Sequence, residues 1–236
     1  YDKAKSMLKS IIKANPIDGR ANFILGNVYL IQTVTDSAKL AFQRGLAGTD
    51  GARLNHIGLG TIDLDAGNIA AAEANFALAL KDTKKKDIEE LIAIGRAYTY
   101  STKPNFKKAI EVLNKAKLIN PNDAIVHLAL GDAYIGDKNQ NDAYAAYRNA
   151  FQFDPTLLRA KMQLGVLLKG AKSYDEAIKS FNEVIAINPS YGPVYRELAE
   201  TFYKWGRNKP SKSEEYMQTA IGYYEKYLSL TDHSLH

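Results

Sequence analysis

One length recurs along this chain and limits the folds available to it. Segment 128–155 (LALGDAYIGDKNQNDAYAAYRNAFQFDP) and segment 162–189 (MQLGVLLKGAKSYDEAIKSFNEVIAINP) carry matching residues 34 positions apart. Leu130-Gly131 corresponds to Leu164-Gly165, and each segment closes with an Asp-Pro or Asn-Pro pair. Small, aromatic and Pro positions that agree at one offset indicate stacked copies of a single structural unit.

The pattern continues in both directions, as six full copies after a leading half-copy. The Gly of the Leu-Gly pair reappears at Gly26, Gly60 and Gly95, and Ala199 takes its place in the last copy. We expect one domain over residues 1–236, because copies that stack on one another bury a shared core. The expected bounds are the second helix of a truncated copy at 1–16, then full copies at 17–50, 51–85, 86–121, 122–155, 156–189 and 190–232.

Each copy has the apolar spacing of two helices. In the copy at 122–155, apolar residues recur three or four positions apart on both sides of the polar run GDKNQND. This spacing places them on one face of each helix, and the polar run predicts the turn between the helices. Pro155 ends the second helix, because a Pro cannot continue it. Gly131 should lie where the two helices approach, and Tyr147 should fill the space between them.

These residues resemble the tetratricopeptide repeat (TPR) family. The match rests on the 34-residue length, the Leu-Gly-x-x-Tyr start at 130–134, the central Ala143, the aromatic Tyr147 and the closing Asp154-Pro155. It covers nearly the whole chain and implies an all-α fold, a right-handed α-solenoid of stacked antiparallel helix pairs. Pentatricopeptide repeats have a similar length and bind RNA, but they lack this Gly–Ala–Pro pattern.

Two positions depart from the family pattern. Asp63 stands where the aromatic residue of a first helix is expected, so that copy either packs loosely or turns Ile62 and Leu64 inward. The turn around 101–105 is two residues longer than in the other copies.

The resemblance implies that the first helix of each copy lines a concave groove that receives a protein or peptide. The outward positions mix aromatic, aliphatic and charged residues, which suits protein recognition better than a single ionic ligand. Some of these side chains could instead pack against the next copy. The carboxylate clamp of chaperone-tail binders is not expected, because Phe23 stands where its Lys would be, one turn before Asn27. The predicted partner-groove residues are Phe23, Asn27, Thr61, Arg96, Tyr100, Asp132, Met162, Arg196, Glu200 and Tyr203.

Residue patterns for chemistry are weak, and we expect no enzyme, no cofactor and no metal. The chain has no Cys, which excludes thiolate metal sites and Cys nucleophiles. His56 and His127 occupy the same place in two copies, which indicates packing, and His233 and His236 would form only a weak metal contact. The acidic stretch at 63–68 lacks the third acidic ligand and the distal Glu of an EF-hand.

The charge is uneven, but its distribution does not predict a nucleic-acid partner. Of the 31 basic and 26 acidic residues, 18 and 12 fall in residues 1–118. The basic run 84–86 lies between copies, whereas Lys103, Lys107 and Lys108 lie within one, so the two groups should point to opposite edges. A nucleic-acid track needs clustered charge. No apolar run approaches the roughly 18–20 residues that span a bilayer.

Two functions from different classes remain. The first is a protein-interaction scaffold that binds a protein or peptide in its groove, and the second is a TPR segment of a larger multidomain protein whose activity lies elsewhere. The chain starts on a second helix and ends without a polar capping helix, so we expect it to continue or to associate end to end as a homo-oligomer. Its style resembles exported TPR proteins of Gram-negative bacteria, which favours the periplasm by resemblance alone.

The last copy holds an insertion near 206–215. Its stretch FYKWGRNKPSKSEEYM (202–217) contains Trp205, the only Trp, and places the central Ala at Ala220, nine residues late. We expect Phe202 to close the first helix, and Ser211 and Glu214 to form a capping box for a second helix from about Lys212 to about Leu230. Only 206–210 would remain as an added loop, with Trp205 at its root. The basic residues of this stretch are expected to be solvated.

Overall fold

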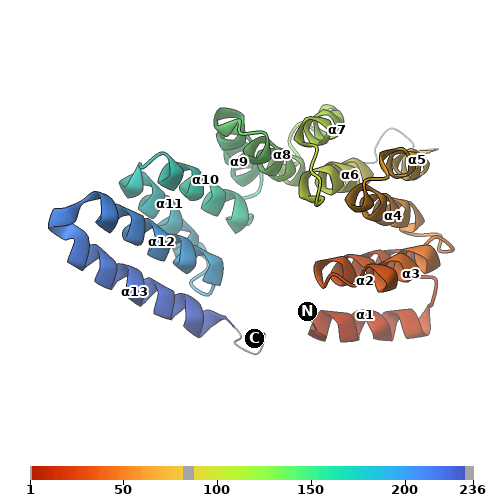
Figure 1. The fold of residues 1–236 in the computed structure, drawn as a ribbon, viewed down its shortest axis with the longest axis horizontal. Helices are drawn as coiled ribbons and strands as arrows, with labels where there is room; N and C mark the ends of the chain where they lie inside the picture. Colours follow the sequence, from red (N-terminus) through yellow and green to blue (C-terminus); the bar gives the residue numbers. More distant parts are fainter. Residues whose placement is uncertain (1, 82–87, 232–236) are drawn as a thin grey trace. The chain divides into compact units, whose positions relative to one another are not determined.

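The chain folds into helices throughout the part that the structure describes. A computed structural model describes residues 2–81 and 88–231, with the backbone alone for 2–4 (Figure 1). These residues form one leading helix, then six helix pairs, with a 3-10 turn η1 (Pro210–Lys212) in the last pair and no strand. The helices are α1 (Asp2–Ala14), α2 (Gly19–Ile31), α3 (Thr35–Gly45), α4 (Ala52–Ala66), α5 (Ile69–Ala79), α6 (Ile88–Tyr100), α7 (Phe106–Ile119), α8 (Ala124–Gly136), α9 (Gln140–Phe153), α10 (Leu158–Gly170), α11 (Tyr174–Ile187), α12 (Gly192–Asn208) and α13 (Ser213–Leu230).

The helices group into two compact units, each described by itself below. The N-terminal unit comprises 1–121 and 132–139, and the C-terminal unit comprises 122–131 and 140–236. Helix α8 therefore gives its first part to the C-terminal unit and its last part to the N-terminal unit. Within each unit, consecutive helices pack as pairs, such as α4 with α5 and α10 with α11 (Figure 1).

Glycine and aromatic residues meet inside several of the helix pairs, as the repeat pattern predicts. A Cβ atom added at Gly131 would overlap the ring of Tyr147, and one added at Gly165 would overlap the ring of Phe181. Both rings are fully buried. The missing side chain of Gly therefore lets the two helices approach until the aromatic ring fills the space between them.

Both departures from the repeat pattern lie in the N-terminal unit. Of the two residues expected to turn inward beside Asp63, Leu64 is buried and Ile62 is half-buried, so that alternative is met fully only at Leu64. Asp65 accepts hydrogen bonds from the Ser101 hydroxyl and the Thr102 backbone N–H, both at 2.8 Å. The longer turn after α6 therefore uses its extra residues to bind the preceding copy. These bonds also occupy a carboxylate of the stretch that faintly resembles a calcium loop.

The insertion in the last copy mainly lengthens a helix, which corrects the prediction of a loop. Helix α12 does not close at Phe202 but continues to Asn208, and η1 then leads into α13. The expected capping box is also absent: Lys212 is the N-cap of α13 and makes no side-chain capping hydrogen bond. Ser211 cannot take that role because it lies inside η1. The predicted span of the second helix, about 212 to about 230, is confirmed.

Candidate functional site

Two predicted groove residues of the N-terminal unit are brought together by the structure. Tyr100, the last residue of α6, donates a hydrogen bond of 2.6 Å from its hydroxyl to Oδ2 of Asp132 on α8. Tyr100 remains 58% exposed, whereas Asp132 is buried. A buried carboxylate thus orients an exposed aromatic ring on the first helix of the preceding copy.

The other predicted residues of this unit lie on three first helices. Phe23 is half-buried, with its ring centre 6.1 Å from that of Phe42. Asn27 and Arg96 are also half-buried. The hydroxyl of Thr61 donates to the backbone carbonyl of Ile57 within α4, at 2.9 Å. The structure does not join these four into one cluster.

An ion pair missed by the sequence reasoning ties three successive first helices at their starts. Both terminal nitrogens of Arg20 on α2 bind the two carboxylate oxygens of Glu89 on α6, at 2.8 and 2.9 Å. The Nε of Arg20 also lies 3.1 Å from Oδ2 of Asp50, just before α4. Hydrogen bonds and the negative charge of Glu89 raise the pKa of Arg20 above its ordinary value. The pair is half-exposed, so it orients the helices more than it stabilises them.

A network of four charges joins α10 and α12 in the C-terminal unit. The Nζ of Lys169 lies 2.6 Å from Oε2 of Glu197 and 2.8 Å from Oε2 of Glu200. A terminal nitrogen of Arg196 lies 2.9 Å from Oε1 of Glu197. The Lys169 and Glu197 side chains are only 5% and 8% exposed. Two predicted residues, Arg196 and Glu200, are thus held in place by two that were not predicted.

The network also alters the acidity of its members. Partial burial opposes ionisation of Glu200, but the hydrogen bond from Lys169 and the positive charges of Lys169, Arg196 and Lys204 outweigh it, so the pKa of Glu200 is lowered. Burial, together with the nearby charge of Glu200, raises the pKa of Tyr224 on α13. Glu200 therefore carries its negative charge at neutral pH.

The two remaining predicted residues of this unit have opposite surroundings. Tyr203 is 44% exposed, and the guanidinium of Arg207 lies 5.9 Å from its ring centre. In contrast, Met162 lies in the core cluster with Phe181 and Leu198, where it fills space between α10 and its neighbours. A partner can reach Tyr203 in this arrangement, whereas it cannot reach Met162.

The sequence contains one weak signal for the ion pair between Lys169 and Glu197. Glu197 stands directly before Leu198-Ala199, the pair that aligns with the packed Leu-Gly of the other copies. An acid beside a buried position suggests a buried partner. The sequence does not predict that Lys169 is the partner of Glu197, because Lys169 lies in the preceding copy.

Other candidate groups have structural partners. The Nδ1 of His56 lies 3.3 Å from Oδ1 of Asn75, and buried His127 lies against the ring of Phe153. In 2–81 and 88–231 no group of three or more His, Asp or Glu residues could hold a metal ion. The described helices also include none with the length and apolar character needed to cross a membrane. His233 and His236 lie outside the described residues.

The structure describes the basic residues of the N-terminal half only in part. Lys103 and Lys107 are exposed, and the Nζ of Lys108 lies 3.8 Å from Glu111. The run 84–86 lies outside the described residues, so the predicted separation of the two basic groups stays a prediction. The same holds for the expected absence of a nucleic-acid partner.

Part of the chain matches a family model and a curated relative. The family model described as tetratricopeptide repeat matches residues 93–123 and 158–191. A curated relative, the peroxisomal targeting signal receptor of Saccharomyces cerevisiae, is 31% identical over 91 residues. This match covers 36% of the chain and 15% of the receptor, so the chain spans a small part of that relative. The relative is a yeast protein, and the expected likeness to exported bacterial proteins receives no support from it.

Solved structures agree on the fold. The chain is similar to the crystal structure of the APC/C hetero-tetramer Cut9-Hcn1, with a TM-score of 0.61 and 15% identity, over 99% of this chain and 44% of that one. It is also similar to a thermophilic TPR protein of Thermus thermophilus, with a TM-score of 0.59 and 19% identity, over 78% and 98% of the two chains. At these identities the likeness concerns the all-α repeat fold.

Proposed function

We propose that this chain, which contains tetratricopeptide repeats, is a scaffold that binds a protein or peptide partner through its first helices. The observation that carries the proposal is Tyr100, whose ring is exposed while its hydroxyl is held by buried Asp132. Tyr and Arg side chains supply much of the energy of protein interfaces. A ring that is oriented before binding loses less conformational entropy when the partner arrives.

The yeast relative supports this class of function. Its name describes a receptor for a targeting signal, which is a binding function. Arg96 lies one turn before Tyr100 on α6, so the two side chains can contact one partner segment. We therefore place one contact region of the proposed groove at the C-terminal end of α6.

A matched pair of double variants tests the proposal. The wild-type chain, an Arg96→Glu, Tyr100→Ala variant and a Tyr144→Ala, Arg148→Glu variant would each be immobilised and exposed to lysate of the source organism. Tyr144 and Arg148 offer the same two residue types one turn apart on α9, a second helix, and both are exposed. We expect loss of specific partners for the α6 variant alone. Equal capture by all three proteins would exclude this part of the groove.

A second candidate is a partner-binding segment within a longer protein whose activity lies elsewhere. Its support is the yeast receptor, of which the chain covers only 15%. To test this candidate, the proteins captured by the isolated chain would be compared with those captured by the full-length protein. We expect the full-length protein to capture every partner of the isolated chain. If it captured none of them, the second candidate would be contradicted.

A further inference from the structure

The insertion in the last copy creates a basic pocket at the edge of the C-terminal unit. The pocket has a volume of about 350 Å³ and lies between the end of α10, the start of α11 and the end of α12. Its polar lining consists of Lys169, Lys172, Tyr174, Lys204, Arg207 and Asn208. Of these, Lys172, Lys204, Arg207 and Asn208 are exposed.

The pocket exists because α12 is longer than the other first helices. Helix α12 has 17 residues, whereas α6, α8 and α10 have 13 each. At the 34-residue period Lys204 corresponds to Gly170, the last residue of α10, so residues 205–208 form an additional turn. That turn carries Arg207 and Asn208 over the α10–α11 turn of the preceding copy.

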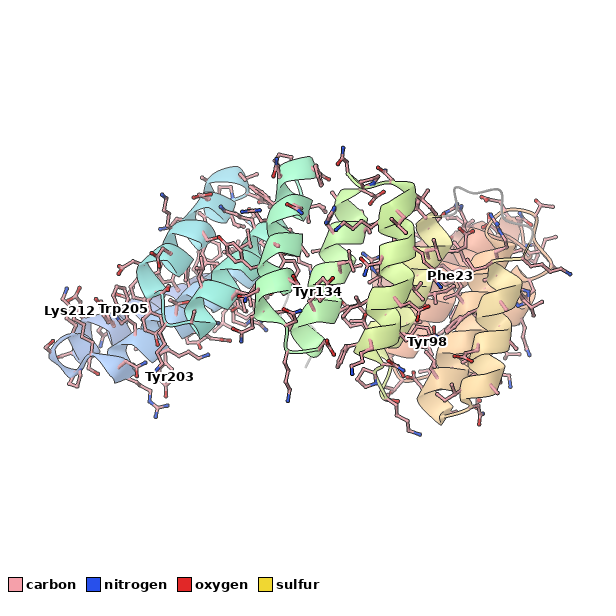
Figure 2. All side chains as sticks on the ribbon, turned by 90° about the horizontal axis from the view of Figure 1, so that it is seen from above. Phe23, Tyr98, Tyr134, Tyr203, Trp205 and Lys212 are labelled. Atoms are coloured by element: carbon pink, nitrogen blue, oxygen red, sulfur yellow. The ribbon has the colours of Figure 1, made fainter. Side chains whose placement is uncertain are left out.

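Aromatic stacking and hydrogen bonds hold this wall of the pocket. The ring of Trp205 stacks between Tyr174 and Tyr216, with ring centres 5.6 and 4.6 Å away. The side-chain amide of Asn208 donates to the Tyr174 hydroxyl at 2.8 Å. Trp205 and Lys212 both lie against Tyr216 and are drawn close together in Figure 2, with Tyr203 apart from them in that view. The contacts of Trp205 and Asn208 therefore hold the added turn in place, and this turn presents the cation Arg207.

The charges of the pocket are unbalanced on the solvent side. Lys169 is paired with Glu197 and Glu200, and the charge of Lys204 also acts on Glu200, whereas the lining residues themselves include no carboxylate. Cations near the C-terminal ends of α10 and α12 interact favourably with the helix dipoles. That interaction alone does not explain why three cations line the same pocket. Lys172, Lys204 and Arg207 thus form a positive surface that a negative group can complete.

We propose that this pocket binds an acidic segment of a protein partner, through Asp or Glu side chains. Carboxylates would pair with Lys172, Lys204 and Arg207, and the Tyr174 hydroxyl, which accepts a hydrogen bond from Asn208, can donate its own proton to a carboxylate oxygen. A pocket of this size suits a few side chains, whereas a nucleic acid needs an extended basic track with aromatic faces open to the bases. The pocket belongs to the C-terminal unit, whereas Arg96 and Tyr100 belong to the N-terminal unit.

The only Trp of the chain provides the readout. A hexapeptide of Glu residues, blocked at both ends, and the matching Gln peptide would be titrated while the fluorescence of Trp205 and, separately, the heat of binding are recorded. We expect saturable binding of the Glu peptide alone, weakened about tenfold or more by high salt, because exposed ion pairs are screened. No measurable heat with the Glu peptide at low salt would overturn the proposal.

Charge-reversal variants locate the binding. Arg207→Glu and Lys172→Glu should each weaken the Glu peptide about tenfold, whereas Lys179→Glu, an exposed Lys on α11, should not. Circular dichroism would confirm that all three variants fold. Equal weakening by all three would show general charge attraction and refute the pocket. A third arm uses a phosphoserine peptide and inorganic phosphate, and tighter binding of either than of the Glu peptide would replace the acidic-segment assignment by a phosphate site.

Discussion

The hydroxyl of Tyr100 donates a hydrogen bond of 2.6 Å to buried Asp132, which lies on the first helix of the next copy. Removing the hydroxyl in Tyr100→Phe leaves a buried carboxylate with one donor fewer. We expect the free energy of unfolding to fall by about 1–2 kcal/mol. Urea denaturation would measure this, with Tyr144→Phe on exposed Tyr144 as the control that changes little. Identical midpoints for Tyr100→Phe and the wild type would contradict the structural role of this bond.

Lys169 should be far more sensitive than a surface Lys. Lys169→Met leaves Glu197 buried without its cation from α10, and we expect a loss of about 3–5 kcal/mol of stability. Adding Glu197→Gln should recover much of the loss, because the uncompensated charge is gone. The control is Lys115→Met, which removes an exposed pair with Glu111 and should cost less than about 1 kcal/mol. Similar losses for Lys169→Met and Lys115→Met would refute the buried network.

The lowered pKa of Glu200 should make the stability of the fold depend on pH. Because its pKa is lower in the folded chain than its ordinary value of 4.5, its ionised form stabilises the fold above that value, and this contribution is lost as the pH falls through the folded pKa. Urea midpoints recorded from about pH 6 to about pH 3 should therefore fall more steeply for the wild type than for Glu200→Gln. Parallel curves for the two proteins would rule out this assignment.

Two glycines should respond to Ala in opposite directions. A Cβ atom at Gly165 would overlap the ring of Phe181, so Gly165→Ala should destabilise the fold by about 1–3 kcal/mol. Gly222 on α13 has open space around it, so Gly222→Ala should stabilise by about 0.5–1 kcal/mol through helix propensity alone. Thermal denaturation of the two variants checks both signs, and a stabilising Gly165→Ala would disprove the close helix approach.

Substitutions on the exposed apolar face of α13 would test the predicted end-to-end association. Ile221 and Leu228 are about half exposed, and at the corresponding positions of α11, Ile178 and Ile185 pack against the core that α11 shares with α12. We expect the molar mass from light scattering to rise with concentration for the wild type and not for Ile221→Lys, Leu228→Lys. Leu118→Lys on α7, which also replaces an exposed apolar residue, should behave as the wild type does. A wild-type monomer at all concentrations would refute the association.

Contacts inside a copy were readable from the sequence. The pairing of Gly131 with Tyr147 and of Gly165 with Phe181 follows from the period, because the two residues of each pair lie only 16 positions apart on adjacent antiparallel helices. The span of the helix after the insertion was also predicted, but from a capping box at Ser211 and Glu214 that the structure does not contain. The repeat period therefore predicts the helix pairs and the residues that pack between their two helices.

Contacts between copies were not readable in this way. Lys169 meets Glu197, Asp65 meets Ser101, and Asn208 meets Tyr174 across 28, 36 and 34 residues. Each of these contacts depends on how far one helix pair is rotated against the next, and the repeat pattern leaves that rotation open. The same reason explains Met162, which falls at an outward position by period but lies in the core.

The stretch FYKWGRNKPSKSEEYM shows both sides of this division. Its length and its displaced Ala220 reveal an insertion in one repeat, because a fixed period makes nine extra residues visible. Its conformation depends on packing: Trp205 stacks between Tyr174 and Tyr216, and this contact stabilises an additional helical turn where local signals predicted a loop. Stacking on Tyr216 of the same copy and on Tyr174 of the preceding copy outweighs local preference there, and the repeat pattern alone does not say which rings Trp205 will contact.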